Sequence, residues 1–121
     1  MMIKADFYRD PDGNITRFTI TGHAGSGPYG YDIVCAAVSA VAIGTVNGIE
    51  GLAGIMPAVQ TDDEEGGLLT ATLPAVMVQE KLTIAQILLE NLLLELQSIR
   101  AEYGQFLQVK TNQDTQPSPV A

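Results

Sequence analysis

The sequence lacks tryptophan and has little positive charge, with one cysteine, one histidine and only six lysine and arginine residues in 121. A single cysteine cannot form a disulfide within the chain. A net charge of −8 with so few basic residues argues against a basic surface for nucleic acid, so we expect no direct binding of RNA or DNA. We also expect no signal region and no run of about twenty apolar residues that could span a membrane. These absences favour a cytoplasmic protein.

Metal binding is also poorly supported. One histidine and one cysteine supply half of a typical zinc site, and the acidic cluster at residues 62–65 lacks the spacing of a calcium loop. We therefore expect neither a metal nor another cofactor.

The length and the hydrophobic content of 46% suit one domain with an ordinary two-layer core. We expect this domain to occupy residues 1–110. Residues 111–121 are polar and contain two prolines, so we expect a disordered tail.

The expected elements repeat one pattern, in which two short strands precede a helix. Turn signals lie between the strands of each pair, Pro11-Asp12-Gly13 in the first and an acidic, glycine-containing segment in the second. The expected strands are 3–9, 15–21, 58–62 and 68–73, and the expected helices are 33–52 and 76 or 81 to 103. Gly104 is expected to cap the second helix, and 106–109 to form an edge strand. The predicted fold is α+β, a two-layer ββαββα(β) arrangement with a mainly antiparallel sheet packed against two helices.

The second helix is richer in leucine and isoleucine than one core-facing stripe requires. Two interpretations remain open. A second copy of the chain covers the excess surface in a homodimer, or the helix is fully buried in a monomer between the sheet and the first helix.

The one histidine, His23, and the one cysteine, Cys35, lie on either side of a glycine-rich segment. Asp32 is a good N-cap residue, which would place Cys35 in the first turn of a helix, where the positive helix end favours a thiolate. A histidine at a strand end could take the thiol proton and return it to a leaving amine. The free N–H groups of the same turn could hold the oxyanion of an acyl-transfer intermediate.

Structural roles remain open for each of these residues. A lone cysteine at the start of an apolar helix is most often a small buried hydrophobe, and a lone histidine is usually structural. Asp32 either caps the helix or orients His23, as the third member of a triad would. Ser39, one turn after Cys35, either hydrogen-bonds the pair or only allows close packing.

The run Gly22-His23-Ala24, followed by the continuous segment from Gly30 to Ala40, resembles the signature of the bacterial ribosomal-processing cysteine protease family, Prp. The likeness extends over about residues 2 to 110. It implies a catalytic dyad of His23 and Cys35, with Asp32 and Ser39 in support. It also implies a mobile substrate loop, for which the candidate residues are Gly22, Ala24, Gly25, Gly27, Tyr29, Gly30 and Tyr31.

The resemblance further implies the substrate, which is the N-terminal extension of ribosomal protein twenty-seven of the large subunit, and it agrees with a homodimer. An acidic chain would also attract a basic ribosomal protein. Two alternatives remain open. One is a non-catalytic assembly module that binds a ribosomal-protein tail, and the other is a thiol-dependent acyl transferase or hydrolase of small molecules.

Overall fold

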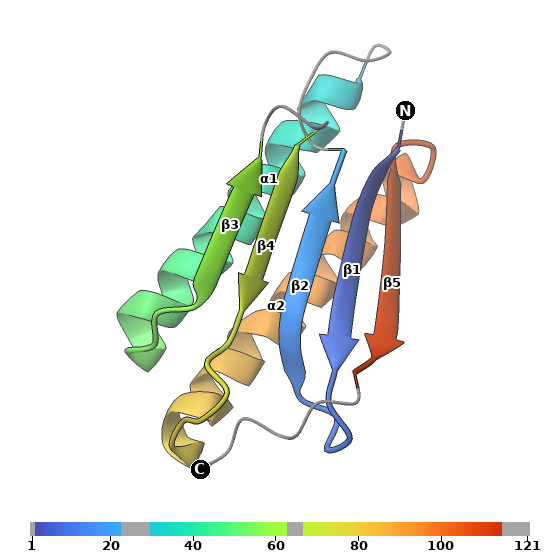
Figure 1. Cartoon of the computed structure of the whole chain (residues 1–121). Helices are drawn as coiled ribbons and strands as arrows, with labels where there is room; N and C mark the ends of the chain where they lie inside the picture. Colours follow the sequence, from blue (N-terminus) through green and yellow to red (C-terminus); the bar gives the residue numbers. More distant parts are fainter. Residues whose placement is uncertain (1, 23–29, 63–66, 115–121) are drawn as a thin grey trace.

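The computed structural model describes residues 2–22, 30–62 and 67–114. Within these residues the chain forms five strands, two α-helices and one π-helical turn (Figure 1). In chain order they are β1 (Ile3–Arg9), β2 (Ile15–Thr21), α1 (Tyr31–Gly48), η1 (Ile49–Ala53), β3 (Ala58–Asp62), β4 (Leu68–Thr72), α2 (Gln79–Tyr103) and β5 (Leu107–Gln113). The repeated strand-strand-helix pattern is therefore confirmed.

The five strands form one sheet in the order β3-β4-β2-β1-β5. Every neighbouring pair is antiparallel except β1 and β5, which run parallel at one edge. Both helices lie on the same face of this sheet, so the molecule has two layers (Figure 1). The predicted α+β fold with a mainly antiparallel sheet is confirmed.

The turn between β1 and β2 is held by the side chain of Asp10. Its Oδ1 accepts hydrogen bonds from the N–H groups of Asp12 and Asn14, at 2.9 and 3.0 Å. Gly13 has a φ of 88°, in the left-handed region that glycine adopts without strain. Turn chemistry and alternating strands therefore place this hairpin where the sequence predicts it.

Alternate residues of the central strands point toward the helices and form the core. Ile3, Ala5 and Phe7 of β1 are buried, and the rings of Phe7 and Phe18 lie 5.9 Å apart between their centroids. From the helix layer, α2 contributes a buried stripe with helical spacing, which comprises Leu82, Ala85, Leu89, Leu92, Leu93 and Leu96.

Several predicted details at the ends of elements differ from the structure. The first helix begins at Tyr31 rather than 33, because Gly30 adopts a left-handed φ of 92° and turns the chain into the helix. Gly104 follows α2 as expected, but its φ of −61° is right-handed. Strand β5 continues through Gln113, so residues 111–113 belong to the sheet rather than to a disordered tail. The rest of the expected tail, from 115 onward, lies outside the described residues.

Within the described residues, two helical segments are long and apolar enough to span a membrane by length and composition alone, namely Tyr31–Ala53 and Gln79–Tyr103. The expectation that no such segment exists is therefore wrong. In this fold, both segments bury one side in the core and pack on the same face of the sheet (Figure 1). Part of their apolar surface is used here in packing against the sheet.

Candidate active site around Cys35

The N-terminus of α1 differs from the predicted arrangement in its capping residue. Gly30 occupies the N-cap position and accepts a hydrogen bond from the N–H of Val34 at 3.2 Å. Asp32 is the second residue of the helix, is exposed, and makes no capping hydrogen bond. The prediction that Asp32 caps the helix is therefore wrong, although its carboxylate still lies in the first turn near the positive helix end.

Cys35 is the fifth residue of α1, one position beyond the first turn in which it is predicted to lie. A residue at this position donates its N–H within the helix, so the free amides of the helix end belong to the residues before it. The thiol is partly buried against the core. Burial, and secondarily the negative charge of Asp32, raise the pKa of Cys35. The described surroundings therefore favour the thiol, contrary to the expected stabilisation of a thiolate.

Tyr31 connects the end of β2 to the start of α1. Its hydroxyl donates a hydrogen bond to the backbone carbonyl oxygen of Gly22, the residue directly before His23. Tyr31 and Cys35 are one helical turn apart. Burial first, and then negative charge on Cys35 and Asp32, raise the pKa of the Tyr31 hydroxyl. The start of the segment that carries His23 is thus held close to the face of α1 that carries Cys35.

Close packing surrounds this connection. The rings of Tyr31 and Phe106 meet edge to face with centroids 6.1 Å apart, and the carbonyl oxygen of Phe106 accepts a hydrogen bond from Ile3. Gly22 has a φ of 78°, and a Cβ there would lie 2.6 Å from the carbonyl oxygen of Met2. Only glycine fits this approach without displacing backbone.

The structure brings some of the predicted site residues together, and the others lie outside the described residues. Gly22, Gly30, Tyr31, Asp32 and Cys35 gather at one end of the fold, and Ser39 lies one turn beyond Cys35, half-buried. Tyr31 is not a loop residue, because it begins α1 and is buried. The remaining predicted residues, His23, Ala24, Gly25, Gly27 and Tyr29, lie outside the described part of the chain.

The structural role of Tyr31 and its pairing with Phe106 are not evident from the sequence. The available signal is that both aromatic residues lie at the starts of predicted elements, Tyr31 two residues before the first helix and Phe106 as the first residue of the last strand. A metal cluster is not seen in residues 2–22, 30–62 and 67–114, where no three histidine, cysteine or acidic side chains gather.

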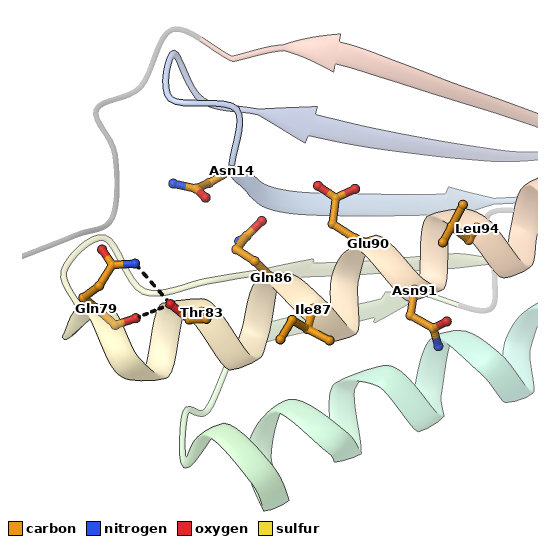
Figure 2. A pocket seen from close by; sticks show the side chains of 8 residues that line it. All are labelled: Asn14, Gln79, Thr83, Gln86, Ile87, Glu90, Asn91 and Leu94. Carbon is orange, nitrogen blue, oxygen red and sulfur yellow. Dashed lines mark hydrogen bonds between the residues drawn. The ribbon is translucent and has the colours of Figure 1, made fainter.

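A hollow of about 560 Å³ lies at the other end of the sheet (Figure 2). It is lined by Asn14, which precedes β2, and by exposed and half-buried residues of α2, including Gln86, Ile87, Glu90 and Leu94. Gly22 follows β2, and this strand of seven residues separates the two places by roughly 20 Å. This hollow is therefore distinct from the surroundings of Cys35.

Comparison with known proteins connects the fold to one family. Residues 2–108 match the family described as Cysteine protease Prp. The ribosomal processing cysteine protease Prp of Bacillus subtilis is 38% identical over 111 residues, covering 92% of this chain and 98% of that protein. Its counterpart from Staphylococcus aureus strain Mu50 is also 38% identical, over 86% of this chain and 93% of its own length.

Solved structures agree with this match. A Streptococcus mutans protein aligns with a TM-score of 0.85 and 34% identity, covering 94% of this chain and 100% of that structure. The S. aureus ribosomal processing protease Prp, crystallised with a substrate peptide, aligns with a TM-score of 0.80 and 34% identity over 92% and 100% of the two chains. The resemblance seen in the sequence is confirmed, and the chain belongs to the Prp family of cysteine proteases.

Proposed function

We propose that this protein is a cysteine endopeptidase that removes the N-terminal extension of ribosomal protein twenty-seven of the large subunit. Cys35 is the nucleophile, and His23 is its general base and acid. The supporting observation is the hydrogen bond from the Tyr31 hydroxyl to the carbonyl oxygen of Gly22. Gly22 directly precedes His23 in the sequence, and Tyr31 lies one helical turn before Cys35. The compartment that we propose is the cytoplasm.

In this mechanism His23 takes the thiol proton, and the sulfur of Cys35 attacks the carbonyl carbon of the scissile bond. The C–N bond then breaks, and the imidazolium gives its proton to the leaving amine, which begins the mature protein. The N-terminal piece remains as a thioester on Cys35. His23 next takes a proton from water, the hydroxide displaces the sulfur, and a carboxylate and the free thiol result.

The raised pKa of Cys35 gives His23 a specific task in this proposal. Burial and Asp32 both oppose the thiolate, so a positive imidazolium is needed to stabilise it.

The relatives support the reaction class. The S. aureus protease has been crystallised with a substrate peptide and with a covalently linked product peptide.

Mass spectrometry of the extended ribosomal protein tests the proposal. The substrate is incubated with the wild-type chain, with Cys35→Ala and with His23→Ala, and Thr83→Ala on the exposed side of α2 serves as the matched control. We expect one cleavage site with wild type and control, and an intact substrate with the other two. If the substrate binds but wild type leaves it intact, the non-catalytic module replaces the endopeptidase.

We also propose a homodimer. The alternative, in which α2 is fully buried in a monomer, is wrong, because Ile87 and Leu94 are 65% and 63% exposed in the single chain. On α1, Ile33 and Ile43 are likewise exposed. Apolar residues on the outer sides of both helices are the supporting observation, since such surfaces are commonly covered in an oligomer.

A further inference from the structure

A second hollow, of about 480 Å³, lies at the end of the fold that carries Gly22 and the start of α1. It is lined by Met2 and Lys4 at the start of β1, by Arg100 and Gly104 at the end of α2, and by Leu107 and Gln108 of β5. Two elements thus each contribute one cation to the same small space. Lys4 and Gln108 are register partners on adjacent strands, which places Gln108 beside Lys4.

Two of the other cations have partners in the structure. Arg9 is paired with Glu90 at 2.6 Å, and the guanidinium of Arg17 lies 4.1 Å from the centroid of the Tyr8 ring. In the described ranges, by contrast, neither Lys4 nor Arg100 has a carboxylate within ion-pair distance. In a chain with a net charge of −8, a hollow with two unpaired cations is a local exception to the overall charge.

The hollow borders the candidate active site through shared residues. Met2, which lines it, is the residue whose carbonyl oxygen lies against Gly22. Leu107, which also lines it, follows Phe106, whose ring packs on Tyr31. The hollow therefore lies at the same end of the fold as the surroundings of Cys35.

We propose that this hollow is a subsite that binds an acidic side chain of the substrate peptide, with Lys4 and Arg100 contacting its carboxylate. The inference rests on the proposed endopeptidase function and adds a specificity to it. The overall negative charge attracts a basic protein, whereas the subsite selects one acidic residue near the cleaved bond. Gly104 leaves part of the wall free of a side chain, which gives the carboxylate access to both cations.

Peptide pairs test the subsite by binding, without dependence on catalysis. The peptides derive from the N-terminus of the extended ribosomal protein, and each position in turn carries aspartate or asparagine. Their affinity for Cys35→Ala is measured by fluorescence anisotropy. At one position we expect aspartate to bind about tenfold more tightly, as a charge-assisted contact of roughly 1.4 kcal/mol would give.

The variants assign that preference to the two cations. Lys4→Gln and Arg100→Gln, each combined with Cys35→Ala, should remove the preference for aspartate. Arg100→Lys in the same background keeps the positive charge and should retain most of it. Lys81→Gln at the other end of α2 is the matched control and should leave it unchanged. If Arg100 only stabilised the C-terminal end of α2, its replacement would not change the preference for aspartate over asparagine.

The proposal is overturned if no peptide binds, if aspartate and asparagine bind equally at every position, or if the preference survives in both glutamine variants. Failure of the proposed function is recognised separately. If wild type cuts none of the peptides while the preference persists in Cys35→Ala, the endopeptidase is rejected and the subsite stands. If wild type cuts them without any preference, the subsite is rejected and the endopeptidase stands.

Discussion

Cys35 combines two properties that conflict in the nucleophile proposed for it. It is partly buried against the core, which protects and positions the sulfur, but burial and the nearby Asp32 raise its pKa. The helix dipole acts most strongly in the first turn, and Cys35 lies beyond that turn. The dipole therefore cannot fully offset the raised pKa. The reactivity of the thiol is therefore expected to depend on a cationic partner.

Replacing Asp32 in a variant that lacks His23 measures the effect of the Asp32 charge on Cys35 alone. In the His23→Ala background no dyad remains, so Asp32→Asn only removes a negative charge that destabilises the thiolate. The pKa of Cys35 should fall, and the rate of alkylation by iodoacetamide should reach its midpoint at a lower pH. Glu80→Gln, in the first turn of the other helix, should leave that midpoint unchanged. An unchanged or higher midpoint in Asp32→Asn would contradict this account.

Tyr31→Phe removes only the hydroxyl that bonds to Gly22 and keeps the ring against Phe106. We expect a loss of about 1 kcal/mol in unfolding free energy, typical of one hydrogen bond. We also expect kcat to fall more than KM rises, because the start of the His23 segment loses its attachment to α1. Tyr103→Phe at the end of α2 is the control. Equal kcat values in the two variants would show that Tyr31 has only a packing role.

At the scale of elements, the bounds predicted for β1, β2 and β3 are confirmed, whereas the start of α1 and the extent of β5 differ. Strand bounds follow from local signals, namely alternating apolar residues and the turn at Pro11-Asp12-Gly13, and β1 and β2 have the predicted bounds. The start of α1 depends on the left-handed backbone of Gly30, which composition does not reveal. Strand β5 extends to Gln113 because it pairs with the whole length of β1, a partner far away in sequence.

Helix α2 is fixed to the start of β2 by Gln86. Its side-chain oxygen accepts from the N–H of Ile15 and its amide nitrogen donates to the Ile15 carbonyl oxygen, both at 2.7 Å. Figure 2 shows Gln86 and Glu90 pointing from α2 toward the strands. Ile15 lies where the register of β1 and β2 shifts, so the side chain completes hydrogen bonding that the neighbouring strand leaves irregular.

Gln86→Leu should therefore reduce the unfolding free energy by about 2 kcal/mol, because it leaves the two backbone groups of Ile15 without their partner. Urea denaturation followed by circular dichroism measures the change. Gln97→Leu, on an exposed position of the same helix, should change stability little. Equal midpoints for the two variants would indicate that water replaces the amide of Gln86 at no cost.

At the scale of the whole molecule, the sequence predicts the two layers and the end of the fold where the site residues gather. It does not predict which apolar residues remain uncovered, because that depends on how far the sheet shields each helix. Leu89 and Leu92 of α2 are buried, whereas Leu94 on the same helix is exposed. The exposed apolar residues therefore indicate where a second copy of the chain would bind.

The proposed homodimer makes Ile87 and Leu94 the residues to change. They lie seven positions apart on one side of α2, so a partner that covers this side contacts both. The double variant Ile87→Gln with Leu94→Gln should be monomeric in light scattering at micromolar concentration, where wild type has the mass of a dimer. Val59→Gln, on edge strand β3, is the matched exposed control and should remain dimeric. A monomeric wild type would reject the dimer, and a dimeric double variant would place its interface on another surface, of which the exposed side of α1 is the next to test.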